Sequence, residues 1–339
     1  MGRLKIAVLG LGNISKRHIK NMGSRADLVL VGRSLDRAES FKALMQLASA
    51  EVRSYEDLRR SDDLNAIIIC TPPQQHCQQI EELWPTGASL LVEKPLCTSP
   101  EELLKIERLQ SKPLRSNQFL MVGENYYYKP STIFLRERIR SGALGDIKHI
   151  RVAKGSEQKS SDWRQAYGSL LEGGVHYLAL LHDLMDAAGA PLQGPIKSTI
   201  AVPQGMNVER ESHVIQRGGS LTAELIYSWC RPVLLKGLFQ WSFVEGSRGK
   251  ITFETNGILE ISSRFFPMIQ VNIRDIAGFQ GLMNDLLLCL ETGRTPYSDF
   301  KRAARDLHVP FEVYRAHGLS SEGRVVKDIS AVSTKSATA

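Results

Sequence analysis

The stretch that decides the fold is Leu4–Ser15, which reads LKIAVLGLGNIS. Its first six residues form a short apolar run, typical of a strand covered on both faces, and a Gly-Leu-Gly turn then leads into a helix. Gly10 permits the tight turn, and Gly12 has no side chain to keep a pyrophosphate away from the N–H groups at the helix start. We place Asn13 and Ile14, which begin that helix, at the same phosphate site. The stretch predicts a strand, turn and helix that bind a dinucleotide.

The third glycine of the usual G-x-G-x-x-G pattern is replaced by Ser15. This position serves the close packing of the helix on the strand, and serine is small enough to occupy it. The pattern alone is a weak signal, but here it follows a predicted strand, opens a helix and precedes a second strand at Leu28–Val31. This context favours a dinucleotide site over an ordinary glycine turn.

The end of the second strand indicates which nicotinamide cofactor is bound. An NAD site places Asp or Glu about 20 residues after the glycines, where the carboxylate holds the ribose 2′-hydroxyl. Here the strand ends Gly32-Arg33-Ser34, without a carboxylate. Arg33 offers a planar cationic fork and Ser34 a hydroxyl donor for a 2′-phosphate. We therefore predict NADP; if Arg33 is only a solvated surface charge, the site takes NAD as well.

The composition is that of an ordinary globular protein. The 339 residues are long enough for two domains, and 42% hydrophobic and 23% charged residues exclude a largely disordered chain. No apolar run approaches the length of a membrane span, and the N-terminus shows no secretion signal. The five cysteines have neither C-x-x-C nor disulfide spacing, and no metal-binding cluster is expected. We expect a cytoplasmic protein.

The formal net charge of +7 raises the question of nucleic acid. Residues 1–40 hold eight Lys and Arg against three acids, and basic residues elsewhere are scattered. This excess surrounds the proposed phosphate site. An anionic cofactor accounts for it better than a nucleic-acid-binding face without a known motif.

A Thr-Pro-Pro motif follows the next buried strand, Ala66–Cys70. Two prolines prevent the strand from continuing and fix a loop at the edge where ligands of open α/β sheets bind. We therefore place Thr71, Pro72 and Pro73 at the cofactor. His76 begins the following helix, and it either lines the nicotinamide side of the cleft or merely lies near the helix start.

A Glu-Lys-Pro motif follows the strand Ser89–Val92. Because Pro95 restricts the backbone, Lys94 is expected to point at the same cleft as the glycine loop, with Glu93 beside it. We interpret Lys94 as a general acid or base next to the cofactor. The alternative is a structural ion pair between Lys94 and Glu93.

The remainder of the chain predicts a second domain. The junction segment Glu124–Pro130, ENYYYKP, is aromatic and polar, and we place Tyr126 at the substrate because small-molecule sites are common between domains. Short alternating segments between residues 196 and 273 favour a mostly antiparallel sheet. The units that we expect are a dinucleotide-binding domain (1–123), a substrate-binding domain (124–329) and a frayed tail (330–339).

The order of these motifs, followed by a glycine-rich helix start that contains His176, resembles the glucose–fructose oxidoreductase and inositol dehydrogenase family, Gfo/Idh/MocA, over roughly residues 3–320. The resemblance implies an α/β fold class: an N-terminal Rossmann doubly wound parallel sheet, followed by an α/β domain with a large, mostly antiparallel open sheet. The exposed face of that sheet usually joins subunits, which implies a homodimer or homotetramer.

The resemblance also implies roles for particular residues. The lysine of the family's E-K-P motif is Lys94, and its D-x-x-x-H pair corresponds to Glu172 and His176, so the usual Asp is a Glu here. We expect Lys94, His176 and Glu172 to be catalytic. Trp163 and Arg164 correspond to a region that often borders the substrate; Arg164 either binds an anionic group or pairs with a surface acid.

The expected activity is that of an NADP-dependent oxidoreductase. It transfers a hydride between nicotinamide and a hydroxyl or ketone carbon of a sugar, cyclitol or nucleotide-linked sugar. Two alternatives within the same fold are an imine or enone reductase and a glycosidase assisted by bound NAD. A third alternative, from a different class of protein, is a cofactor-binding regulator without catalytic activity.

Overall fold

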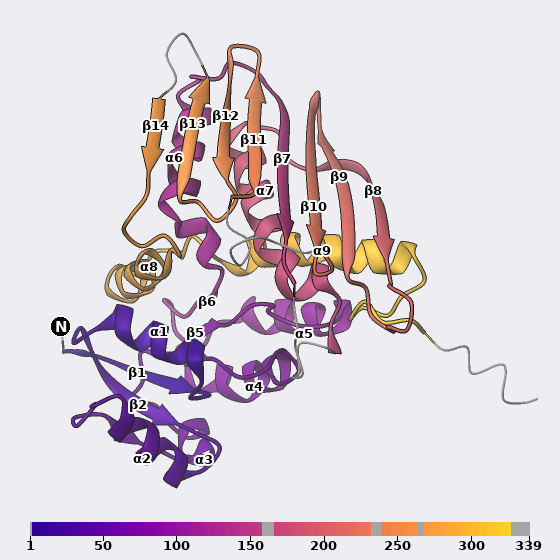
Figure 1. Cartoon of the computed structure of the whole chain (residues 1–339). Helices are drawn as coiled ribbons and strands as arrows, with labels where there is room; N and C mark the ends of the chain where they lie inside the picture. The colour runs from indigo at the N-terminus through magenta and orange to yellow at the C-terminus, as the bar shows by residue number, and fades with distance from the viewer. Residues whose placement is uncertain (1, 158–165, 232–238, 264–267, 327–339) are drawn as a thin grey trace, which may run out of the picture.

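A computed structural model describes residues 2–157, 166–231, 239–263 and 268–326. In this part of the chain the strands form two sheets, one of six strands and one of eight (Figure 1). The smaller sheet lies in the indigo and purple first third of the chain, and the larger one runs from magenta to orange. The predicted fold class is confirmed: a parallel Rossmann sheet precedes a mostly antiparallel sheet.

The smaller sheet is parallel throughout, with the order β3-β2-β1-β4-β5-β6. Its central strands are continuous apolar runs that are inaccessible to solvent in their middle, as parallel strands covered on both faces require. The strands are β1 (Leu4–Leu9), β2 (Ala26–Val31), β3 (Glu51–Val52), β4 (Ala66–Ile69), β5 (Ser89–Val92) and β6 (Leu120–Val122).

Helices connect these strands, because successive parallel strands need a crossover that returns the chain to the same end of the sheet. They are α1 (Asn13–Met22), α2 (Leu35–Leu44), α3 (Tyr55–Arg59), α4 (His76–Leu83) and α5 (Pro100–Gln110). The strand order reverses between β1 and β4, so the carboxyl ends of these two strands diverge into the crevice where such sheets bind ligands.

The glycine turn after β1 is required by close packing at that crevice. Gly10 has φ +90°, and a Cβ there would lie 2.8 Å from the Cys70 carbonyl carbon and 2.9 Å from the Thr71 nitrogen. Gly12 differs, because no protein atom lies within 4 Å of the position of its Cβ. The space beside Gly12 is therefore open toward the crevice, as a bound pyrophosphate requires.

Ser15 occupies the third glycine position without disturbing this arrangement. Its side chain is fully buried, and its hydroxyl donates to the Gly12 carbonyl at 2.8 Å. The serine is thus accommodated by an internal hydrogen bond of the turn.

The larger sheet has the order β14-β13-β12-β11-β7-β10-β9-β8. All its neighbouring strands are antiparallel except β7 and β10, which are parallel. The strands are β7 (Ile147–Gly155), β8 (Gln193–Ala201), β9 (Glu211–Gly218), β10 (Leu221–Ser228), β11 (Trp241–Gly246), β12 (Gly249–Glu254), β13 (Leu259–Ser263) and β14 (Met268–Val271).

One face of the larger sheet is covered by helices. Burial alternates along β9 and β10, so that one side of each strand packs in the core and the other is more exposed. The covering helices are α6 (Pro130–Arg140), α7 (Val175–Ala187) and α9 (Phe300–Ala316). In the described residues, no helix has the length and apolar content that crossing a membrane demands.

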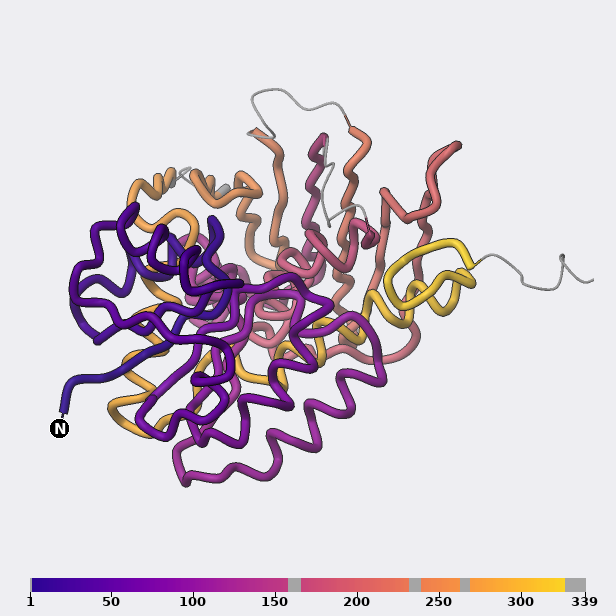
Figure 2. Tube along the Cα trace, turned by 90° about the horizontal axis from the view of Figure 1, so that it is seen from below, coloured from indigo at the N-terminus to yellow at the C-terminus, as the bar shows by residue number. Residues whose placement is uncertain are grey.

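The end of the chain returns to the smaller sheet. Helix α8 (Phe279–Thr292) packs against α1, where Arg25 Nη1 donates to Asn284 Oδ1 at 2.7 Å. The Val122 N–H donates to the Ser298 carbonyl at 2.8 Å, which extends the pairing at the β6 edge. Figure 2 shows the orange and yellow C-terminal segments running beside the indigo and purple N-terminal part.

Candidate functional site

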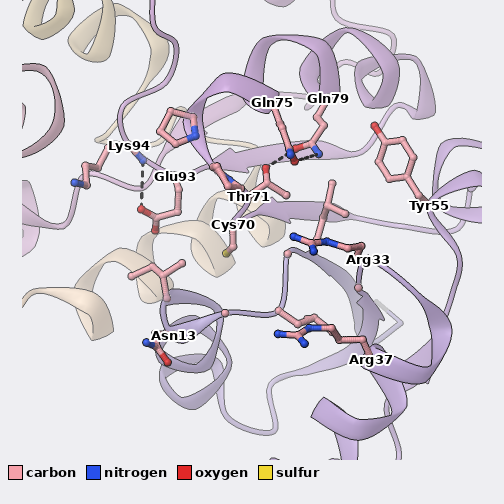
Figure 3. Close-up of a pocket in the computed structure, with 18 of the residues that line it drawn as sticks. Asn13, Arg33, Arg37, Tyr55, Cys70, Thr71, Gln75, Gln79, Glu93 and Lys94 are labelled. Atoms are coloured by element: carbon pink, nitrogen blue, oxygen red, sulfur yellow. Dashed lines mark hydrogen bonds between the residues drawn. The ribbon is translucent and has the colours of Figure 1, made fainter. Parts of the chain in front are cut away.

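A cleft of about 780 Å³ opens at the carboxyl ends of the parallel strands, a size suited to a cofactor or small molecule. It brings together eleven residues that the sequence analysis placed at the cofactor or the reaction. These are Gly10, Gly12, Asn13, Ile14, Arg33, Thr71, Pro72, Pro73, Glu93, Lys94 and Glu172. Figure 3 shows the labelled side chains around the opening.

The cleft fits a dinucleotide by its shape and charge. The open space beside Gly12 leaves the start of α1 accessible to an anion. Arg33 and Arg37 line the cleft after β2 (Figure 3), and guanidinium groups suit phosphate. The sequence analysis counted Arg37 only within the basic excess; its position in the first turn of α2, four residues after Arg33, was the signal that it faces the same cleft.

Other lining residues were missed by sequence reasoning. Tyr55, Gln75 and Gln79 lie at the same opening (Figure 3). Thr71 Oγ1 donates to Gln79 Oε1 at 2.5 Å, and Gln79 Nε2 donates to Gln75 Oε1 at 3.3 Å. Gln75 and Gln79 are thus ordered by each other and by Thr71, whereas Tyr55 donates from its hydroxyl to Glu82 Oε2 at 2.7 Å.

Two predicted cofactor residues, Ser34 and His76, are not among the residues that line the cleft. Ser34 is the N-cap of α2, and its Oγ accepts from the Arg37 N–H at 3.3 Å. His76 is fully buried, with Nδ1 2.9 Å from the Pro95 carbonyl and Nε2 2.9 Å from the Thr71 carbonyl. Neither side chain lines the cleft. The Ser34 hydroxyl caps α2, and the His76 ring connects the loops that follow β4 and β5. Burial lowers the pKa of His76.

Lys94 turns away from its neighbour Glu93, as Figure 3 shows. Its Nζ donates to the backbone carbonyl of Glu172 at 2.8 Å and lies 3.6 Å from Glu172 Oε1. Glu172 belongs to a short π-helix, Leu170–Gly174, that leads into α7. The ammonium and this carboxylate thus meet at the same wall of the cleft, and the geometry disfavours the alternative of a Lys94–Glu93 ion pair.

Glu93 has a partner of its own, His18. The distance from His18 Nε2 to Glu93 Oε1 is 2.6 Å, and both side chains are buried. Burial acts to raise the pKa of the Glu93 carboxyl, but the His18 hydrogen bond and the nearby Lys94 charge outweigh it and hold that pKa below its usual range. An anionic carboxylate therefore stands in the cleft beside Lys94.

His176 lies in the first turn of α7 and is held by a carboxylate that sequence reasoning did not select. Its Nδ1 is 2.7 Å from Glu124 Oε1 and 2.9 Å from Oε2. Its ring stacks on Tyr126 with centroids 4.8 Å apart and an interplanar angle of 17°. Tyr126 in turn donates from its hydroxyl to that of Tyr177 at 3.0 Å. Trp163 and Arg164 lie outside the described residues.

In the described residues, no group of His, Cys, Asp and Glu is arranged to hold a metal ion. A glycine turn at a sheet crevice, two arginines and a half-buried lysine beside a carboxylate define a dinucleotide-binding α/β protein. Residues 4–122 match the family described as oxidoreductase family, NAD-binding Rossmann fold (GFO_IDH_MocA). This match confirms, over these residues, the resemblance to the Gfo/Idh/MocA family that was stated from the motifs.

Relatives with known names match only part of the chain. Inositol 2-dehydrogenase from Rhizobium meliloti is 27% identical over 149 residues, which are 44% of this chain and 44% of that protein. Trans-1,2-dihydrobenzene-1,2-diol dehydrogenase from Mus musculus is 27% identical over 164 residues, 47% of this chain and 48% of that one. These matches therefore span less than half the length of either relative.

The whole fold has counterparts among solved structures. Aldose-aldose oxidoreductase from Caulobacter crescentus aligns with a TM-score of 0.80 and 20% identity, covering 96% of this chain and 100% of that one. At this identity the likeness shows a shared fold that includes both sheets.

Proposed function

We propose that the protein is an NADP-dependent oxidoreductase that transfers a hydride between nicotinamide and a hydroxyl or ketone carbon of a sugar, cyclitol or nucleotide-linked sugar. The observation that carries this proposal is the meeting of Lys94 and Glu172 in the same cleft as the glycine turn. An acid–base group beside a dinucleotide site is what the oxidation of an alcohol needs.

The cofactor supplies the hydride chemistry when it is bound, and the protein supplies position and proton transfer. The N–H groups at the start of α1 hold the pyrophosphate. Lys94 binds the substrate oxygen and stabilises the charge that develops on it as its proton leaves. Glu172 orients the Lys94 ammonium through its carbonyl and carboxylate. His176 exchanges the proton.

Preference for NADP is supported by the charges at the end of β2. Arg33 and Arg37 line this part of the cleft, and the acids that line the described cleft, Glu93 and Glu172, lie beside Lys94 at its other end. A 2′-phosphate would thus meet two cations and no adjacent carboxylate.

A paired titration with NADPH and NADH tests the proposal. We would follow energy transfer from tryptophan to the reduced nicotinamide at fixed ionic strength, and then screen polyols and sugars with NADP⁺ for the appearance of NADPH absorbance. Tighter binding of NADPH and turnover of at least one polyol are expected. Equal binding of NADH would remove the NADP preference, and binding without any turnover would favour the cofactor-binding regulator.

We also propose that subunits associate through the more exposed face of the larger sheet, as a homodimer or homotetramer. Ile269 is 65% exposed and pairs with Ile261, which continues a row through Thr252 to Phe243. An apolar row on an open sheet face is typical of an interface. Light scattering after gel filtration should give an oligomer, and Ile269→Glu should reduce its mass, whereas Leu104→Glu on exposed α5 should not.

A further inference from the structure

Two carboxylates on separate elements each hold one of the basic side chains to which the proposed function assigns a role. Glu172 lies against Lys94, with 3.6 Å between Oε1 and Nζ. Glu124, two residues after the end of the edge strand β6, holds His176 through both of its oxygens. The two basic side chains thus have separate anionic supports. His176 does not line the cleft, but it is near enough for its charge to act on Glu93, which does.

Glu124 is itself fixed in place. Its side chain is 5% exposed, and its Oε1 accepts from the Tyr126 N–H at 3.0 Å. Since an ionised carboxylate has only acceptors, the His176 nitrogen that faces it must carry a proton. The neutral ring therefore has its proton on Nδ1 and a lone pair on Nε2.

The His176 ring is also clamped against rotation. Tyr126 stacks on one side of it, and the Tyr126 hydroxyl is tethered to Tyr177, the next residue along α7. Within the described part of the chain, no hydrogen-bond partner is found for His176 Nε2. The imidazole side chain is 18% exposed, so Nε2 remains accessible.

We propose that Glu124 is a positioning residue that fixes the Nδ1–H tautomer of His176 and leaves Nε2 as the base for the substrate hydroxyl. This rests on the proposed function. In the oxidation direction the hydroxyl proton moves to Nε2, the carbon–hydrogen bond yields its electron pair and hydrogen to NADP⁺ as hydride, and the carbonyl forms. Glu124 then neutralises the imidazolium, and reduction reverses each transfer.

The tautomer can be measured without turnover. In protein labelled with ¹⁵N-histidine, long-range proton–nitrogen correlation distinguishes a protonated Nδ1 from a protonated Nε2, and loss of signals in His176→Gln assigns the ring. We expect wild-type His176 to carry its proton on Nδ1. Glu124→Ala should give a mixture of tautomers, whereas Glu172→Gln should leave the His176 signals at their wild-type tautomer.

Kinetics then separate positioning from a merely structural role. Glu124→Gln is nearly isosteric and keeps an acceptor oxygen but no charge, so kcat should fall roughly 10- to 100-fold with little change in KM or NADPH affinity. Glu124→Asp should restore part of the loss. Exposed Glu291→Gln serves as the unchanged control.

The outcomes distinguish the two proposals. A proton on Nε2 in the wild type, or an unchanged His176 tautomer in Glu124→Ala, would overturn the role of Glu124 whatever the activity. A normal kcat in Glu124→Gln would overturn it as well. A protonated Nδ1 in a wild-type protein that turns over no polyol, sugar or ketone would instead refute the proposed oxidoreductase function. Only the effect of Glu124 on the His176 tautomer would then remain.

Discussion

The two sheets differ in where they bury charge. In the middle of β1, β4 and β5 every side chain is apolar and solvent-inaccessible, and the charged residues begin where the strands end. The covered side of the larger sheet instead contains Lys154 and Glu260, with 8% and 1% of their surfaces exposed. The first sheet keeps its chemistry at one edge, whereas the second has a charged interior.

The charged interior is a cluster of Lys129, Lys154, Glu254 and Glu260. Lys129 Nζ lies 4.2 Å from the centroid of the Tyr126 ring, and Lys154 Nζ donates to Asn256 Oδ1 at 2.9 Å. Burial lowers the pKa of Lys129 to about 8 and raises that of Glu260 to about 7.

This difference explains which parts of a functional site can be predicted from sequence. Where a strand must be apolar on both faces, a polar residue directly after it marks the ligand edge. Where polar and apolar residues alternate, a buried charged residue cannot be distinguished by sequence from an exposed one. The following predictions test the contrast, in order of decreasing expected effect.

The residues at the carboxyl ends of the strands of the smaller sheet should contribute most of the catalytic rate. Lys94→Met is expected to lower kcat about 10³-fold, because it removes the group that binds the substrate oxygen. NADPH affinity should change little. Turnover measured beside exposed Lys105→Met checks this, and near-normal activity of Lys94→Met would mean that another group binds the substrate oxygen.

Substitution of the two glycines of the turn should affect different properties, stability at Gly10 and cofactor affinity at Gly12. Gly10→Ala forces a Cβ to within 2.8 Å of the Cys70 backbone at φ +90°, which should lower the free energy of unfolding by about 2–3 kcal/mol. Gly12→Ala meets no protein atom within 4 Å, so stability should persist while NADPH affinity falls at least roughly tenfold.

Chemical denaturation and a cofactor titration on both glycine variants separate these effects. Unimpaired NADPH binding by Gly12→Ala would place the pyrophosphate away from the glycine turn.

The charged interior should show itself as a pH dependence of stability. The Glu260 carboxyl has a pKa of about 7 in the fold against an ordinary value of 4.5. Its contribution is therefore present below pH 4.5 and lost as the pH rises through 7. Wild-type stability should fall by up to about 3 kcal/mol between pH 4.5 and 8 from this group, and Glu260→Gln should remove that slope.

Lys129→Met is the control of opposite sign. Because the folded pKa of Lys129 is about 8 against 10.5, its buried charge is unfavourable below pH 8 and is relieved as the pH rises toward 10.5. The variant should gain stability at pH 6, with the gain fading in alkali. If the free energy of unfolding changed with pH in the same way for the wild type, Glu260→Gln and Lys129→Met, the charged interior would be contradicted.

The smallest effect is expected at the cofactor's 2′-phosphate. Arg33→Ala and Arg37→Ala should each weaken NADPH binding about tenfold, since one guanidinium–phosphate contact is lost, and leave NADH binding nearly unchanged. Lys20→Ala, exposed on α1, is the matched control. An equal loss for both cofactors would assign the arginines to the pyrophosphate.

How well each site residue could be predicted depends on whether it directly follows a buried strand. The glycine turn, the Thr-Pro-Pro loop and Lys94 could be placed from sequence, because each follows a buried strand and strand ends converge. Ser34 and His76 do not line the cleft, because the serine hydroxyl caps α2 and the imidazole is held by backbone carbonyls. Glu124 was missed because it meets His176 only through the tertiary fold, across 52 positions.

The return of the chain to its beginning has a consequence for exchanging parts between relatives. His18 packs edge-on against Phe279 with ring centroids 5.7 Å apart, and Arg17 lies over the same ring. Residues 298–299 complete the β6 edge. A chimera that grafts only residues 4–122 onto another scaffold would leave the α1 surface and the β6 edge uncovered. The transplantable cofactor module is therefore discontinuous in sequence, and it includes α8 and the segment that follows it.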